Sequence, residues 1–346
     1  MIYAMMLNLK VLSLVIVLCG CTAVNRVQTV ETAPFSAREV IGSSEPLIIA
    51  IGEASHGNET MLSERNRVIM ELAYERRIGL VALETGFAEG RILDDFVRGG
   101  AGDAADVALR GFTSGFGAMP GNVALLTELR QYNLARPASE RVGVAGFDLS
   151  LGGPLGSAPS MAPVTCALDG VIDSTQRQFL QAAFERAVEP GLANAIVADQ
   201  ERTAFRRLSE DLAASLSADA SFEARQCAYI VASSAAILDA LPRAMTPGVM
   251  PADAGISVSL RDQAMADIAV ALFERLNGKS MVVFAHTSHV MSVPMLGGRW
   301  STQTQPPSSM GESLRARFGA RYLVLAQIEA ARTPGGDIPD AVETLA

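Results

Sequence analysis

The fold is decided by residues 47–83, LIIAIGEASHGNETMLSERNRVIMELAYERRIGLVAL. Two short apolar runs in this stretch, Leu47–Ile51 and Leu80–Leu83, are typical of strands that are covered on both faces in a parallel sheet. The segment between them, Glu59–Arg77, predicts a helix that is capped by Asn58 and ends before Gly79. Strand, helix and strand in this order predict a right-handed βαβ unit.

Three more runs of the same kind follow, Arg141–Ala145, Met281–Phe284 and Tyr322–Ala326. We therefore expect an α/β fold, a mostly parallel sheet flanked by helices. Connectors rich in glycine and proline, Gly152–Pro163 and Thr246–Gly255, separate a helical stretch from the rest. This pattern predicts an α/β core over about residues 40–151 and 256–330, with a helical insertion over about 164–245. The further helices expected are Ile172–Val188, Ala193–Leu216, Phe222–Ala240 and Leu260–Leu276.

The composition fits a globular protein and argues against nucleic acid as a partner. Of the 346 residues, 49% are hydrophobic, which is enough to bury a large core. The 28 basic and 37 acidic residues give a formal charge of -9. A chain of this charge repels phosphate backbones.

The N-terminus has the pattern of a bacterial export signal. Lys10 precedes the apolar run Val11–Leu18, which is too short to span a bilayer as a mature helix but suits a signal peptide. The following residues, Leu18-Cys19-Gly20-Cys21-Thr22, resemble a lipobox. We therefore predict a lipoprotein signal peptide over residues 1–20, a mature chain over 21–346 and lipidation of Cys21. The alternatives are an ordinary signal peptide cut nearby, or no export.

Lipidation predicts a cell-envelope protein whose partner is the membrane, reached through the lipid anchor. Thr22, in place of an aspartate, favours the outer membrane, with the chain facing the periplasm. Two cysteines, Cys166 and Cys227, remain in the predicted mature chain. Outside the cytoplasm such a pair tends to oxidise, so we predict a disulfide; two buried free thiols are the alternative.

Polar side chains follow four of the predicted strands. In an open parallel sheet, ligands bind beyond the carboxyl ends of the strands, so these side chains are able to converge. All three histidines of the chain are among them, which indicates a hydrolytic or metal-binding site. The strand-end residues are Glu53, His56, Glu84, Asp148, His286 and His289.

Arg65 lies on the helix that follows His56. It shares a helical stripe with Leu62 and Ile69, so its side chain is expected to face the sheet. Because an unpaired buried guanidinium is costly, we expect Glu53 or Glu84 to be its partner. The alternative is an arginine that reaches solvent from the edge of the helix.

These residues resemble the erythromycin esterase-like hydrolases. The resemblance rests on GExxHG at residues 52–57, Arg65, LVALET at 80–85 and FAHxxHV at 284–290. It spans most of the mature chain, because it extends to further segments. These are Ala145–Asp148, Leu260–Asp262 with Met265 and Ala266, Ser309–Gly311, and Arg317–Gly319.

The resemblance implies hydrolysis of a small-molecule ester or lactone, with macrolide inactivation as one such activity and no cofactor. It implies that His56 is the general base that activates water, without a covalent acyl-enzyme. Glu53 or Glu84 would hold the tautomer of this imidazole. Arg65, His286 and His289 would orient the water or stabilise the oxyanion.

The chain departs from the family where the substrate wall is expected. Residues Gly111–Asn122 are rich in glycine, whereas the family has tryptophan and acidic residues there, and the single tryptophan is Trp300. Ile268 stands where the family commonly has asparagine. The hydrolytic residues can therefore be shared while macrolide specificity is not.

Three other kinds of site were weighed. A serine hydrolase is disfavoured, because the chain has no GxSxG motif. The nearest candidates are Ser55 beside His56 and Ser288 between the two other histidines, and adjacent residues on a strand point to opposite faces. A divalent metal is an open alternative, because zinc or manganese accepts such ligands. A non-catalytic envelope protein that binds a metal or a haem-like ligand is another. The metal ligands would be His56, His286, His289 and Glu84.

Overall fold

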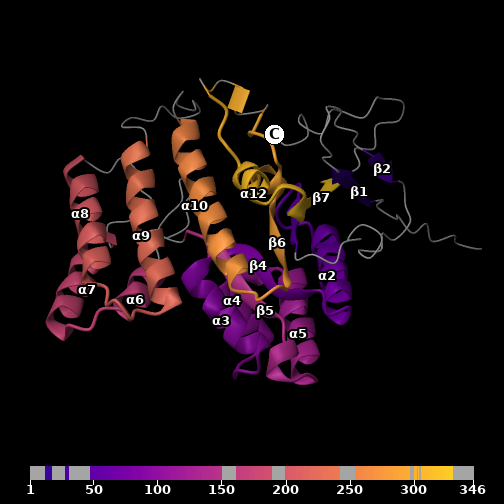
Figure 1. Ribbon diagram of the computed structural model, residues 1–346, viewed down its shortest axis with the longest axis horizontal. Helices are drawn as coiled ribbons and strands as arrows, with labels where there is room; N and C mark the ends of the chain where they lie inside the picture. Colours follow the sequence, from indigo (N-terminus) through magenta and orange to yellow (C-terminus); the bar gives the residue numbers. More distant parts are fainter. Residues whose placement is uncertain are drawn as a thin grey trace, which may run out of the picture.

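A seven-stranded sheet forms the centre of the protein (Figure 1). The computed structural model describes residues 12–17, 28–30, 47–149, 161–188, 199–241, 254–296, 300–301, 303 and 305–329. The strand order is β2-β1-β7-β3-β6-β4-β5. Its parallel part confirms the predicted α/β class and consists of β3 (Ile48–Glu53), β4 (Ile78–Gly86), β5 (Gly143–Asp148), β6 (Ser280–His286) and β7 (Tyr322–Glu329).

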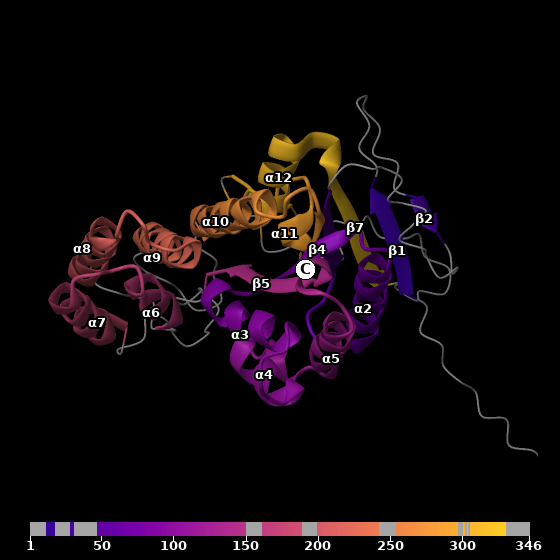
Figure 2. The same cartoon turned by 60° about the horizontal axis from the view of Figure 1, so that its bottom comes forward.

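Helices cover both faces of the sheet (Figure 2). Alternate residues of β3 enter different cores, Ile48 on one face and Ile49 on the other, so the strand is apolar throughout. One face carries α2 (Glu59–Tyr74), α3 (Phe87–Val97), α4 (Ala104–Gly111) and α5 (Pro120–Leu134). The other carries α10 (Ala254–Glu274), α11 (Thr287–Val290) and α12 (Met310–Phe318).

Four further helices stand to one side of the sheet, next to α10 (Figures 1 and 2). They are α6 (Ala162–Leu168), α7 (Ser174–Val188), α8 (Asp199–Ser215) and α9 (Phe222–Ala240). A disulfide between Cys166 and Cys227 joins α6 to α9. Most of the two predicted connectors lies outside the described residues, so the boundaries of the insertion stay a prediction.

The loop between β3 and α2 carries His56. Asn58 caps α2 as predicted, because its side chain accepts hydrogen bonds from the backbone of Thr60 and Met61 at 3.1 and 3.3 Å. The helix ends at Tyr74, earlier than predicted, because Arg76 adopts a left-handed backbone conformation with φ 58°. The short loop and the early cap place His56 directly above the end of β3.

Two antiparallel strands form the edge of the sheet opposite β5. Strand β1 (Leu12–Val17) pairs antiparallel with β7, and β2 (Gln28–Val30) pairs antiparallel with β1. Strand β1 lies within the apolar run of the predicted signal peptide. Cys21 and the segment around it lie outside the described residues, so lipidation stays a prediction. In the described ranges, no helix is both long enough and apolar enough to cross a membrane.

Candidate active site

The structure brings the predicted strand-end residues together at the carboxyl edge of the sheet. Glu53, the last residue of β3, is the register partner of His286, the last residue of β6. The ring centroids of His56 and His286 are 5.0 Å apart, and those of His286 and His289 are 6.4 Å apart. Glu84 on β4 accepts a hydrogen bond from the backbone of His286 at 2.8 Å. All three histidines and both glutamates therefore share one site.

His56 is the most accessible of the three histidines. Its Nδ1 atom lies 2.6 Å from Oε1 of Glu53, and its side chain is 37% exposed whereas Glu53 is buried. Burial lowers the pKa of His56, but the hydrogen bond to Glu53 and the charge of Glu84 outweigh it and raise the pKa above 6.5. With Nδ1 directed at Glu53, Nε2 is the atom left for a substrate.

His286 occupies a different electrostatic setting. Its Nδ1 atom caps α11 by accepting a hydrogen bond from the backbone of Ser288 at 3.2 Å, and it lies 2.8 Å from the Ser288 hydroxyl. Burial and the nearby His56 and His289 lower its pKa to about 4. The ring is therefore neutral near pH 7, with its proton on Nε2, and it is too weak a base to activate Ser288.

Glu84 is a fixed negative charge rather than an acid. Burial raises its pKa, but the neighbouring His289, Arg261 and His56 outweigh burial and hold the pKa at about 2. Its Oε1 atom lies 3.2 Å from Nη2 of Arg261 and 3.5 Å from Nε2 of His289. Glu84 therefore balances the positive charges of the site.

Arg261, on α10, is a site residue that the sequence reasoning did not assign. It binds Asp148 through two hydrogen bonds, Nε to Oδ1 at 2.9 Å and Nη2 to Oδ2 at 2.6 Å. Burial opposes its charge, but Asp148 and Glu84 outweigh burial and raise the pKa of Arg261. The available signal was an Arg261-Asp262 pair of opposite charges next to the apolar residues Met265 and Ala266 of the same helix.

Asp262, also on α10, holds His289 in place. Nδ1 of His289 lies 2.8 and 3.0 Å from the two carboxylate oxygens of Asp262, which is fully buried. Nε2 of His289 lies 3.2 Å from Nη1 of Arg261. Burial lowers the pKa of His289, but Asp262 and Glu84 outweigh burial and raise it. The site thus contains two carboxylate–histidine pairs.

The prediction that Arg65 pairs with Glu53 or Glu84 is wrong. Among the described residues, no carboxylate lies within 4.0 Å of its guanidinium group. The group donates instead to Oδ1 of Asn66, from Nε at 3.0 Å and Nη2 at 2.7 Å, and to Oδ1 of Asn122 at 2.8 Å.

Arg65 does face the sheet, as predicted, and is fully buried. Its guanidinium carbon lies 4.4 Å from the ring centroid of Phe284, a cation–π contact. Burial lowers the pKa of Arg65 to about 10, and the charges of Glu53 and Glu59 oppose that decrease. Amide oxygens and an aromatic face satisfy this arginine, while Glu53 is engaged by His56.

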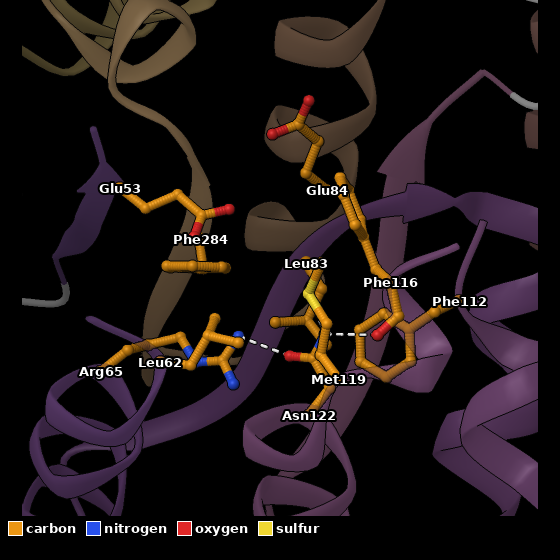
Figure 3. A pocket seen from close by; sticks show the side chains of 10 residues that line it. All are labelled: Glu53, Leu62, Arg65, Leu83, Glu84, Phe112, Phe116, Met119, Asn122 and Phe284. Atoms are coloured by element: carbon orange, nitrogen blue, oxygen red, sulfur yellow. Dashed lines mark hydrogen bonds between the residues drawn. The ribbon is translucent and has the colours of Figure 1, made fainter. Parts of the chain in front are cut away.

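A small cavity of about 10 Å³, room for about one water molecule, lies beside these residues (Figure 3). Within the described part of the chain, Oε2 of Glu53 is buried and has no hydrogen-bond partner. The carboxyl group of Glu53 and the Arg65–Asn122 pair border the cavity on its polar side. Its lining consists of Glu53, Leu62, Arg65, Leu83, Glu84, Phe112, Phe116, Met119, Asn122 and Phe284.

The metal-ligand set weighed from the sequence does not have the geometry of a metal centre. In the ranges that the structure describes, no three or more His, Cys, Asp or Glu side chains are arranged to hold a metal ion. His56 directs Nδ1 at Glu53, and His289 contacts Asp262 and Arg261 through its two nitrogens. Three of the ring nitrogens that a metal could bind are therefore used by protein partners.

Comparisons with known proteins identify a family and a shared fold. Residues 77–330 match the family model described as erythromycin esterase. A crystal structure of a Bacillus cereus protein is 22% identical, with a TM-score of 0.63 over 84% of this chain and 69% of that chain. No protein with a curated description matches the sequence.

Two further crystal structures share the fold. One is of a succinoglycan biosynthesis protein, 18% identical, with a TM-score of 0.60 over 83% of this chain and 66% of that chain. The other is of an erythromycin esterase mutant in its open conformation. It is 16% identical, with a TM-score of 0.57 over 83% of this chain and 72% of that chain. The chain thus spans about two thirds of the length of these structures.

Proposed function

The chain belongs to the erythromycin esterase family, and from this premise we propose that it hydrolyses a carboxylic ester or lactone with His56 as the general base. The observation that carries the proposal is the 2.6 Å pair of Glu53 and His56, in which the His56 side chain is 37% exposed and Glu53 is buried. Glu53 orients the imidazole and stabilises the imidazolium that forms when His56 accepts a proton.

In the proposed reaction, Nε2 of His56 takes a proton from water while the water oxygen attacks the carbonyl carbon. The negative charge that develops on the carbonyl oxygen is stabilised by the neighbouring positive charge of Arg261 and by His289. The C–O bond to the leaving alcohol then breaks, and His56 returns the proton to the alkoxide. A carboxylic acid and an alcohol, or one hydroxy acid from a lactone, are the products.

The test compares the wild type with His56→Ala on a panel of simple esters and macrolides. Loss of the base is expected to lower kcat by about 10²–10⁴-fold. Ser55→Ala, a change at the neighbouring residue, is the control and is expected to retain the wild-type rate. Equal rates for the wild type and His56→Ala would refute the proposal.

We further propose that hydrolysis needs no divalent metal, because Nδ1 of His56 and both ring nitrogens of His289 contact protein groups. Activity is expected to survive exhaustive chelation, with no stoichiometric metal in the purified protein. Restoration of a lost activity by zinc or manganese would contradict this.

The localisation proposed is the cell envelope, with the chain anchored through lipidated Cys21. Processing at that residue removes β1 and leaves β7 at the edge of the sheet. Mass spectrometry of the mature N-terminus tests the proposal, and an unmodified Cys21 would end it.

A further inference from the structure

Helix α11 lies directly on β3, next to the proposed base. A Cβ atom at Gly52 would lie 3.0 Å from the Cα atom of Thr287 and 2.7 Å from Cγ2 of Val290. Separations this short leave no room for a side chain, so a glycine at this position allows α11 to approach the strand. Because Gly52 precedes Glu53, the helix packs beside the residue that binds His56.

The far end of α11 is held by two hydroxyl groups. Tyr322 donates to the carbonyl oxygen of Val290 at 2.7 Å, and Ser309 donates to that of Met291 at 2.5 Å. Carbonyl groups at the end of a helix have no partner within it, so these bonds satisfy them. Tyr322 and Ser309 are buried, which shields both bonds from water. The short helix therefore has a fixed position on the sheet.

His286 joins this helix to the loop that carries the base. Its Nδ1 atom accepts the backbone hydrogen of Ser288 at 3.2 Å and thereby caps α11. The ring also forms a hydrogen bond with the backbone of Ala54. This second bond favours the protonated form of the ring, so the carbonyl oxygen of Ala54 is its acceptor. Since Nδ1 is already an acceptor, the donor to Ala54 is Nε2.

The backbone of His286 is fixed as well. Its N–H group donates to Oε2 of Glu84 at 2.8 Å, and the residue is the register partner of Glu53. Both ring nitrogens are engaged by the protein, so neither is left to contact a substrate or to transfer a proton. His286 differs in this respect from His56, whose Nε2 atom is left for a substrate.

Ala54 is the point at which the chain leaves the sheet. It is the first residue after β3 and is partly buried, whereas Ser55, His56 and Gly57 are exposed. A general base acts only within hydrogen-bond reach of the proton that it takes, and a displacement of about 1 Å can cost about 10²-fold in rate. A hydrogen bond at Ala54 therefore bears directly on where the imidazole of His56 lies.

We propose that His286 is a positioning residue, which fixes the loop that carries His56 by joining Ala54 to α11. This inference rests on the proposed function, because it concerns the same base. It differs from the role that the family resemblance implied for His286, which was to orient the water or stabilise the oxyanion. In the proposed arrangement, the oxyanion is left to Arg261 and His289.

Two conservative variants separate the two hydrogen bonds of the ring. His286→Gln keeps an amide N–H group in place of Nε2 and therefore keeps the donor to Ala54. His286→Asn keeps an oxygen atom that can cap α11, because asparagine is a preferred capping residue, but it has no group in place of Nε2. Tyr229→Phe is the control, because it also removes one hydrogen bond, to Asp267, from helix α9.

Histidine-selective 15N labelling reports on the loop directly, because the chain contains only three histidines. The NMR order parameter of the His56 backbone amide is expected to be about 0.85 in the wild type, His286→Gln and Tyr229→Phe. In His286→Asn it is expected to fall below about 0.6. This measurement needs no substrate and is independent of hydrolysis. An order parameter for His56 that stays at the wild-type value in His286→Asn would overturn the inference.

Hydrolysis of p-nitrophenyl acetate provides the second readout. In His286→Asn, kcat is expected to fall at least about tenfold while KM stays within about twofold of the wild type. His286→Gln is expected to keep kcat within about threefold of the wild type. An equal loss of kcat in both variants would show that the imidazole itself acts on the substrate, and would overturn the inference. The proposed function fails separately, if His56→Ala hydrolyses the ester at the wild-type rate while the order parameters still differ.

Discussion

Three identical imidazole rings have three different acid–base properties in this site. His56 has a raised pKa because of its bond to Glu53, and His289 has a raised pKa because of Asp262. His286 has a pKa of about 4, because burial and the two neighbouring histidines disfavour its charged form. Only His56 combines high basicity with access to a substrate, which is the reason for assigning it the role of base.

The dependence of activity on pH tests that assignment. The neutral form of His56 is the active one, so kcat/KM is expected to fall as pH decreases through a pKa above 6.5. Glu53→Gln removes the carboxylate that raises this pKa, so the acidic limb is expected to move to lower pH while the maximal rate decreases. The measurement is a pH–rate profile of both proteins. A limb that does not move would show that Glu53 does not control the base.

Asp262→Asn tests the second carboxylate–histidine pair. A hydrogen bond to a charged group contributes roughly 1.5–3 kcal/mol, so the loss of the orienting carboxylate is expected to lower kcat at least about tenfold. KM is expected to stay nearly constant, because Asp262 is buried behind His289. Asp267→Asn, which alters an aspartate on the same helix that bonds Tyr229, is the control. A rise in KM alone would argue against an orienting role.

The rule that ligands bind at strand ends predicted most of this site from the sequence, because its polar residues directly follow apolar runs. The partner of Arg65 was predicted wrongly, because a sequence does not reveal that amide oxygens and an aromatic face will surround a charge. Arg261 and Asp262 were missed because they lie on a helix before β6. Their pairing with Asp148 and His289 depends on how α10 packs on the sheet.

At the scale of elements, the five strands of the parallel sheet were predicted, because each is a short apolar run between polar turns. The short helix α11 was not predicted, because four residues show no helical period; it depends on the His286 side chain that caps it. Helix α10 begins at Ala254, before the predicted Leu260. The predicted connector, which extends to Gly255, set the later start, although Asp253 is of a residue type that caps helices.

The disulfide that joins α6 to α9 leads to a prediction about the stability of the protein. Cys166 and Cys227 are separated by 61 residues, and closing a loop of that length is expected to stabilise the fold by up to roughly 4 kcal/mol. A reductant is therefore expected to lower the unfolding midpoint of the wild type. The double variant Cys166→Ser/Cys227→Ser should start lower and not respond. Equal thiol titration of the denatured wild type with and without reductant would exclude the disulfide.

For the whole molecule, Glu84 connects two strands of the sheet to two helices on one of its faces. It contacts Arg261 on α10 and His289 on α11, and it accepts the backbone hydrogen of His286. Its pKa is about 2 in the folded protein and 4.5 when unperturbed. Its contribution to stability is therefore complete above pH 4.5 and is lost as the pH falls toward 2.

Acid unfolding is expected to begin within that interval. Glu84→Gln is expected to destabilise the protein at neutral pH by on the order of 3 kcal/mol, because Arg261 and the buried His289 both lose a negatively charged partner. The same variant should also lose less stability between pH 4.5 and 2 than the wild type. Denaturant titrations of both proteins across this range provide the measurement. Parallel stability curves would show that other carboxylates govern acid unfolding.

The pairing of Glu53 with His286 also has a consequence for synthesis of the protein. The two residues lie on neighbouring strands, but Glu53 is synthesised early, whereas His286 is synthesised only after helices α6 to α9. A nascent chain that ends before β6 therefore carries the base without the histidines that surround it. The hydrolysis proposed for this site therefore requires a chain that extends through β6 and α11, and its appearance over time would report when β6 joins β3.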